Sequence, residues 1–291
     1  MKTRTSKKVL GILVLASLLV TACDKKDDLP ENDSLEMEEI AIADAEVNNV
    51  FQEAVEEIDE LSFVGDYSFP AAGKKSDSTS IGLRGRRNIS TTVDQDGTIR
   101  RVIDYVNFVN PRSRYDREKN GRIRIEISGR PAGPDGFLRK IVFESFKVGK
   151  YTIEGTKTIE RDSENRLQFH VTLENGKVTF EDGTLLLIRN FERTITWVAG
   201  TDTPYFIWDD VYTVEGQGSG ITRDGREFSS LILEPLVIKR NCRYIVSGII
   251  EIKLGDREAL INYSEGEECS GQFRLNTKLR NRIVKFRSGG F

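Results

Sequence analysis

The sequence predicts a mainly β protein: an antiparallel, hairpin-connected sheet preceded by one amphipathic helix. Apolar and polar residues alternate along stretches such as Leu167–Leu173, which is the period of a half-buried strand. Asn-Gly and Asp-Gly pairs recur between such stretches, and these pairs favour tight hairpins. Near the N-terminus, apolar residues instead recur every three or four positions, which indicates a helix. We expect a sandwich or a curved sheet, with an arrangement of two similar halves as one option.

Residues 1–22 have the pattern of a secretory signal peptide. An apolar run, Val9–Val20, follows a short segment that contains four basic residues and no acidic one. Crossing a bilayer takes about 20 apolar residues, and this run is shorter. We therefore expect a cleaved signal and not a transmembrane helix.

Cys23 closes the segment Val20-Thr21-Ala22-Cys23, which resembles the lipobox of bacterial lipoproteins. That resemblance implies cleavage before Cys23, attachment of diacylglycerol and palmitate to it, and anchorage to a membrane. An ordinary signal with an incidental cysteine is the alternative. The charged residues 24–28 resemble export tags of Bacteroidota surface lipoproteins, so we expect the outer membrane and the cell surface. An aspartate directly after the cysteine also resembles a retention signal of other bacteria, which leaves the periplasmic side as the alternative.

Residues 23–33 are predicted to be a charged tether, and residues 34–62 an amphipathic helix. A helix laid on the sheet is favoured over a coiled-coil partner surface, because the seam is short and contains two alanines. Residues 63–89 lack periodicity and are predicted to be a loop or linker, and residues 90–291 the antiparallel β domain. The helical residues that share one face are Ile40, Ala43, Val47, Phe51, Ala54, Ile58 and Leu61.

Cys242 and Cys269 are predicted to form a disulfide, since disulfides persist in exported proteins. The stretch Asn241–Leu254 alternates like a strand, and the Gly-Asp pair after it is a favoured hairpin turn. That turn places Ile252 opposite Ala259, and the same register places the two cysteines opposite each other. Opposed residues of antiparallel strands lie within the reach of a disulfide.

An internal repeat is also predicted. Tyr151-Thr-Ile-Glu-Gly155 matches Tyr212-Thr-Val-Glu-Gly216, and a turn containing aspartate follows each copy. The shared order suggests duplication of a strand-turn-strand unit.

Five segments of the β region share a further resemblance: Gly121–Ile127, Phe143–Phe146, Tyr151–Ile159, Trp208-Asp209-Asp210 and Asn241–Gly248. They are similar to landmarks of a group of Bacteroidota lipoproteins. The resemblance spans roughly residues 90–291. It implies a surface lipoprotein and nothing about mechanism, because the group has no established biochemical activity. Members carry additional cysteines around short Gly-Cys segments, whereas Asp104-Tyr105 and the loop after it have none.

No catalytic residue, metal ligand or cofactor site is predicted. His170 is the only histidine, and it falls on the polar face of its strand, so we expect it at the surface. The glycine-rich segment Gly216–Gly220 looks like a phosphate loop but leads into another strand instead of a helix. It is therefore interpreted as a glycine-rich strand or bulge. Asp209 and Asp210 are adjacent carboxylates, for which a structural or calcium-binding role is favoured over acid–base catalysis.

The best candidate for a ligand site is a cluster of aromatic residues around a loop at residues 200–204. Exposed aromatics beside acids can stack on sugar rings or anchor a partner. The alternative is an ordinary core role, because large aromatics pack well on sheets. The cluster contains Trp197, Tyr205, Phe206, Trp208 and Tyr212.

The charge balance argues against nucleic-acid binding, which requires a basic surface. The net charge is −3 for the full chain, and removal of the basic signal segment makes it more negative. A local basic run is interpreted as a solvated face, with contact to anionic polysaccharide or lipid head groups as the alternative. It consists of Arg112, Arg114, Arg117, Lys119, Arg122 and Arg124.

These observations favour a lipid-anchored envelope protein with a non-enzymatic binding or structural role. Its expected partners are the membrane, through Cys23, and a polysaccharide or an envelope protein. A carrier or chaperone for lipid or lipoprotein on the periplasmic side is the alternative, with a curved sheet covering an apolar cavity beneath the helix. A carboxylate-based enzyme using Asp209 or Asp210 is a third hypothesis.

Overall fold

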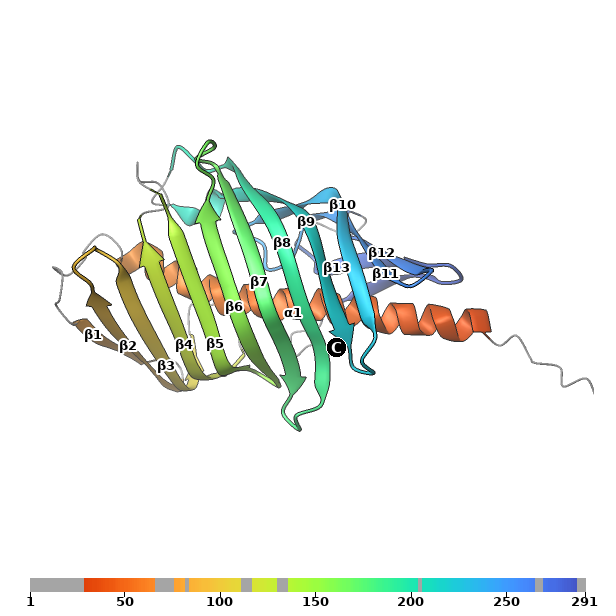
Figure 1. The fold of residues 1–291 in the computed structure, drawn as a ribbon, viewed down its shortest axis with the longest axis horizontal. Coiled ribbons are helices and arrows are strands. Elements are labelled where there is room, and N and C mark those ends of the chain that lie inside the picture. Colours follow the sequence, from red (N-terminus) through yellow and green to blue (C-terminus); the bar gives the residue numbers. More distant parts are fainter. Residues whose placement is uncertain are drawn as a thin grey trace, which may run out of the picture.

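The structure, a computed structural model, describes residues 29–65, 76–81, 84–110, 117–129, 136–203, 206–264 and 269–286. Within these ranges the chain forms one long helix followed by fourteen strands of a single sheet. Each strand pairs antiparallel with the next one along the chain, so the sheet is a continuous meander (Figure 1). The predicted fold class is confirmed, and of its two forms the curved sheet is the one observed.

The elements follow one another without crossover connections. The helix α1 spans Leu29–Gly65, and a 3₁₀ helix, η1, spans Ile207–Asp209. The first seven strands are β1 (Ser76–Ile81), β2 (Arg84–Val93), β3 (Ile99–Val109), β4 (Lys119–Ser128), β5 (Leu138–Val148), β6 (Tyr151–Arg161) and β7 (Gln168–Phe180). The others are β8 (Leu185–Ala199), β9 (Val211–Thr222), β10 (Glu227–Lys239), β11 (Ser247–Leu254), β12 (Arg257–Asn262), β13 (Gln272–Thr277) and β14 (Asn281–Lys285).

The sheet curls around α1. Figure 1 shows the helix running across the strands on one face of the sheet. The helix contacts β8 in the middle of the sheet and also β11, β12 and β13 near its end. The predicted apolar seam is buried from Ile40 to Ile58, while the side chain of Leu61 lies outside the described residues. The opposite side of the helix is buried as well, including Glu38, Ala45 and Asn49, and Glu38 pairs there with Arg280 and Arg282 at the end of the sheet.

β-Bulges give the sheet its curvature. Register shifts recur from the β2–β3 pair to the β10–β11 pair, and each bulge bends its strand. Asn107, Ser145 and Asn175 adopt left-handed backbone conformations at these bends. The side-chain oxygens of Asn120 and Asn190 accept hydrogen bonds from the amides of Asn107 and Asn175, both at 2.7 Å. These side chains therefore provide hydrogen-bond acceptors for backbone amides at points where the strand ladder is interrupted.

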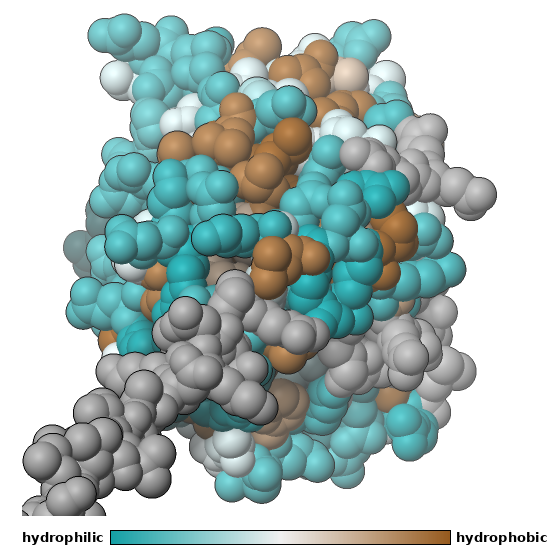
Figure 2. All heavy atoms as spheres, turned by 90° about the vertical axis from the view of Figure 1, so that its right-hand side faces the viewer, coloured by the Kyte–Doolittle hydropathy of each residue, from teal (hydrophilic) through white to brown (hydrophobic). Residues whose placement is uncertain are grey.

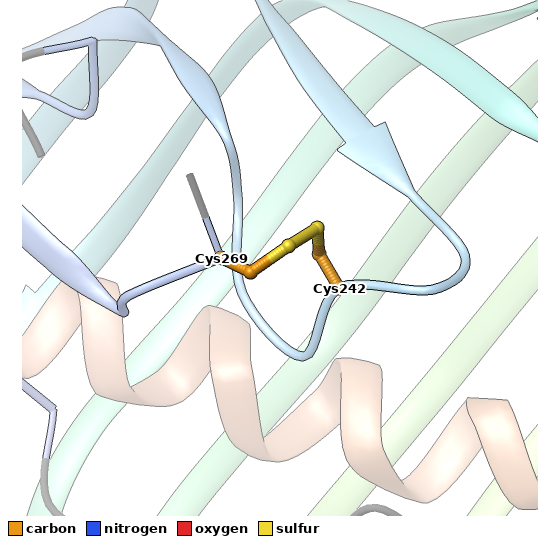
Figure 3. The surroundings of a disulfide bond; sticks show 2 residues. All are labelled: Cys242 and Cys269. Carbon is orange, nitrogen blue, oxygen red and sulfur yellow. A yellow bond between two sulfur atoms is a disulfide. The ribbon is translucent and has the colours of Figure 1, made fainter. Parts of the chain in front are cut away.

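The predicted register of the β11–β12 hairpin is confirmed, with Ile252 opposite Ala259. The disulfide between Cys242 and Cys269 is also present, with 5.0 Å between the two Cα atoms. Figure 3 shows the bridge joining the loop after β10 to the segment before β13. It therefore ties the chain on either side of the hairpin together.

The expected start of that hairpin strand at Asn241 is wrong. β11 begins at Ser247, and the residues before it form turns. The backbone amide of Cys242 donates to the carbonyl oxygen of Lys239 at 2.9 Å, which closes a tight turn after β10. A residue held in that turn cannot extend the β11–β12 ladder. The two cysteines are nevertheless close enough to form the disulfide.

The predicted linker at residues 63–89 is wrong in part, and the sheet begins before residue 90. The helix continues to Gly65, β1 occupies Ser76–Ile81, and β2 begins at Arg84. β1 is a polar strand at the edge of the sheet, and Thr79 is exposed on it. The segment Ser76–Ile81 is mostly polar and lacks an apolar alternation, so the sequence pattern gave no signal for this strand.

The two copies of the predicted repeat begin β6 and β9. Gly155 and Gly216 close the two copies, and both have a positive φ, of 127° and 132°. The strands are three steps apart in an antiparallel meander, so the copies run in opposite directions. Duplication of a unit stays a prediction.

Candidate functional site

The aromatic cluster surrounds the connection between β8 and β9. Trp197 lies opposite Tyr212 in the β8–β9 ladder, and the two rings stack with their centroids 6.1 Å apart. The indole N–H of Trp197 donates to Oδ1 of Asp210 at 3.1 Å, and the hydroxyl of Tyr212 donates to Oδ2 at 2.9 Å. One carboxylate therefore fixes both rings.

Asp210 is a buried anchor of this connection, with 2% of its surface exposed. Burial raises its pKa above the ordinary value, and the hydrogen bond from Tyr212 opposes that rise. Its backbone oxygen accepts the amide of Arg240 at 3.0 Å, which links the connection to the end of β10. Asp209 instead accepts the hydroxyl of Thr203 at 2.6 Å. The two carboxylates bind different partners and do not converge.

Four apolar residues around this connection are exposed, and we call them the aromatic edge: Leu167 (42% exposed), Val198 (51%), Phe206 (56%) and Trp208 (38%). The backbone amide of Trp197 donates to the carbonyl oxygen of Leu167 at 2.8 Å, which brings the start of β7 beside the end of β8. Tyr205 lies outside the described residues. The predicted cluster thus divides into an inner pair, Trp197 and Tyr212, and an outer pair that reaches solvent.

A second set of polar contacts lies between α1 and the sheet, and the sequence analysis did not anticipate it. Buried acids of the helix face basic residues of the sheet: Glu46 lies 3.3 Å from Arg117, and Asp44 pairs with Arg189. The sequence did contain a signal for these ion pairs, because the helical segment has twelve acidic residues and no basic one. Further pairs are Glu53 with Lys119, Glu38 with Arg280, Glu39 with Arg223, and Asp33 with Arg257.

The prediction that the basic run forms a solvated face is therefore wrong for two of its residues. Arg117 and Lys119 are buried, because their strand begins beneath the helix and its acids. Arg122 and Arg124 are exposed and pair with acids on neighbouring strands at 2.6 and 2.7 Å. The first two residues of the run lie outside the described ranges.

His170 is exposed, as predicted, and its Nε2 lies 2.8 Å from Oδ2 of Asp162. The pKa of Asp162 is lowered, first by the backbone amide of Asn165 and then by His170. This pair is a surface contact on β7 and the turn before it.

The glycine-rich segment is part of β9, as predicted. A Cβ atom on Gly220 would lie 2.4 Å from the ring of Phe228, and one on Gly218 would lie 3.2 Å from Nη2 of Arg189. The glycines therefore leave room for a buried aromatic ring and a buried guanidinium group.

Among the described residues, no group of three or more His, Cys, Asp or Glu side chains is placed to hold a metal ion. No helix in the described ranges is long and apolar enough to cross a membrane. Cys23, the predicted lipidation site, lies outside those ranges. No protein-family model, curated protein or solved structure shows a significant match to the chain. The aromatic edge is accordingly the candidate site on which a function can be argued.

Proposed function

We propose that this protein is a lipid-anchored envelope protein, displayed on the outer membrane, that binds polysaccharide through the aromatic edge. The observation that carries the proposal is the exposure of Phe206 and Trp208 on a connection whose base is held by Asp210. Aromatic faces stack on the apolar faces of sugar rings. A fixed base reduces the entropy lost when the side chains are ordered by a ligand.

The neighbouring polar groups suit the same ligand class. Asp209 adjoins Trp208, and its carboxylate can accept hydrogen bonds from sugar hydroxyls. Thr203 holds this carboxylate from the other side of the loop. The proposal includes no catalytic step, since stacking and hydrogen bonding suffice for recognition.

The binding test uses affinity electrophoresis of the purified protein against a panel of soluble polysaccharides. We expect retardation by at least one of them, which Trp208→Ala and Phe206→Ala reduce. Leu231→Ala and Leu233→Ala are matched controls, because both leucines are exposed on β10 away from this connection. The proposal fails if no polysaccharide retards the protein, or if the Trp208 variant migrates like the wild type.

Anchorage through Cys23 is a separate part of the proposal, and it rests on the N-terminal sequence. We expect the native protein in the membrane fraction, with the mass of an acylated chain that begins at Cys23, and a Cys23→Ala variant in the soluble fraction. Protease treatment of intact cells then tests the location. Release of peptides from the β domain, with periplasmic controls intact, supports surface display. Cleavage only after the outer membrane is opened would place the protein inside.

A further inference from the structure

A groove of about 530 Å³ follows the N-terminal half of α1. The helix forms one wall, and the ends of β7, β8 and β9 form the other. Its lining includes apolar and aromatic residues: Tyr151 and Leu187 are buried, and Ile42, Phe180 and Leu186 are partly buried. Figure 2 shows the end of the molecule where α1 begins, with apolar side chains in separate patches among hydrophilic ones. The described residues therefore leave a largely apolar groove open beside the helix.

Charged side chains lie at the rim of this groove, and the basic ones are paired. Arg223 of the sheet lies 2.7 Å from Glu39 of the helix. Arg282 lies 3.1 Å from Glu38, and Arg226 pairs with Glu36. Each of these guanidinium groups is balanced by a helix carboxylate, so the rim offers no excess of positive charge to an anionic head group.

A buried carboxylate that lines the groove is also paired with a cation. Glu46 contacts the buried Arg117 and hydrogen-bonds the hydroxyl of Tyr151. Burial, together with this carboxylate, raises the pKa of Tyr151, so the phenol stays neutral. A ligand in the groove therefore meets apolar side chains and no uncompensated charge.

We propose that this groove binds the single hydrocarbon chain of an uncharged or zwitterionic amphiphile, with its head group in solvent beyond the paired rim. The volume lies within the range of small-molecule sites, which are mostly apolar with a few polar groups. The partly buried side chains from α1, β7 and β8 provide the apolar contact that a hydrocarbon chain requires. The paired rim argues against selection of a charged head group.

This site is independent of the aromatic edge. The groove lies at the β7–β8 and β9–β10 turns, whereas the aromatic edge surrounds the β8–β9 connection. In an antiparallel meander these connections lie at opposite ends of the strands. One site can therefore fail while the other binds.

The test uses the purified protein with N-phenyl-1-naphthylamine, an uncharged probe whose fluorescence rises in apolar sites. We expect saturable binding at one site and displacement by a single-chain lysophosphatidylcholine. Leu186→Gln places an amide in the groove, and Leu186→Trp fills the groove with a larger, mainly apolar side chain. Both should weaken binding about tenfold. Ile232→Gln is the matched control, because Ile232 is partly buried on β10 and does not line the groove.

Several outcomes would overturn the proposal: a signal that does not saturate, failure of the zwitterionic chain to displace the probe, or equal binding by wild type and Leu186→Trp. Equal weakening in Ile232→Gln would also overturn it, since that result indicates general loosening of the fold. Circular dichroism of each variant establishes that the sheet is intact, and Leu186→Trp keeps the test decisive if Leu186→Gln does not fold. Trp208→Ala should leave probe binding unchanged.

Discussion

Replacing Asp44 by asparagine should sharply reduce the free energy of unfolding. Asp44 on α1 and Arg189 on β8 form an ion pair in which both side chains are at most 1% exposed. Arg189 also donates to Oγ of Ser230 at 2.9 Å, and its guanidinium carbon lies 5.7 Å from the centre of the Phe228 ring. These two neighbours are neutral, and Arg193 is a second cation whose charged form Arg189 disfavours and Asp44 favours. The substitution therefore removes the carboxylate that balances a buried cation and leaves two guanidinium groups facing each other.

The expected loss is about 3–5 kcal/mol, the cost of breaking a buried pair by removing one partner. Domains of this kind have a total stability of roughly 5–15 kcal/mol, so the loss is a large fraction of it. Urea unfolding followed by circular dichroism measures it as a fall in the midpoint at an unchanged slope.

Two further variants make the result specific. The double variant Asp44→Leu/Arg189→Met removes both charges and should recover part of the lost stability, because paired buried charges are often no more stabilising than apolar residues. Recovery is partial because Arg193 still loses the attraction of Asp44. Asp104→Asn disrupts an exposed pair with Arg122 on the surface of the sheet and should change stability by only about 0–1 kcal/mol. A loss below about 1 kcal/mol for Asp44→Asn, or no recovery in the double variant, would refute the reasoning.

Three other predictions concern stability and ionisation. Replacing Cys242 and Cys269 together by serine should lower the free energy of unfolding by about 3.5 kcal/mol, the value of the chain-entropy model for a separation of 27 residues. Urea unfolding under oxidising conditions measures this loss, and an unchanged midpoint would contradict the prediction. Gly220→Ala should lower the free energy of unfolding by about 1–3 kcal/mol, because the new Cβ would lie 2.3 Å from the backbone carbonyl oxygen of Ile188. An unchanged thermal unfolding midpoint would show that the strand can shift to make room. The pKa of Asp210 is raised by burial, so between its ordinary value and its folded value the folded chain binds more protons than the unfolded chain. Stability contributed by this group therefore falls as pH rises through that window, and Asp210→Asn should remove the dependence. The fluorescence of Trp197, measured in a variant without the second tryptophan, should titrate with a midpoint above 3.8, and a lower midpoint would be inconsistent with the buried carboxylate.

The sequence by itself determined the features that depend on neighbouring residues. Alternation with a period of two predicted the strands, because successive side chains of a strand point to opposite faces. The turn pair after Leu254 determined the hairpin register, and that register brought Cys242 and Cys269 together. The helical seam was predictable for the same reason, since residues three and four apart share a face.

Only the tertiary structure decided how far the sheet bends and what the bend encloses. The bulges at Asn107 and Asn175 bend the strands, and no alternation pattern specifies their summed effect. The bend places Arg117 and Arg189 against acids of α1 that are more than seventy residues away in the chain. The fold also separates the inner pair, Trp197 and Tyr212, from the exposed pair, Phe206 and Trp208. The burial of a side chain depends on what packs over its strand as well as on the face to which it points. Charge and hydropathy are local properties, whereas the partner of each buried group depends on the path of the whole sheet.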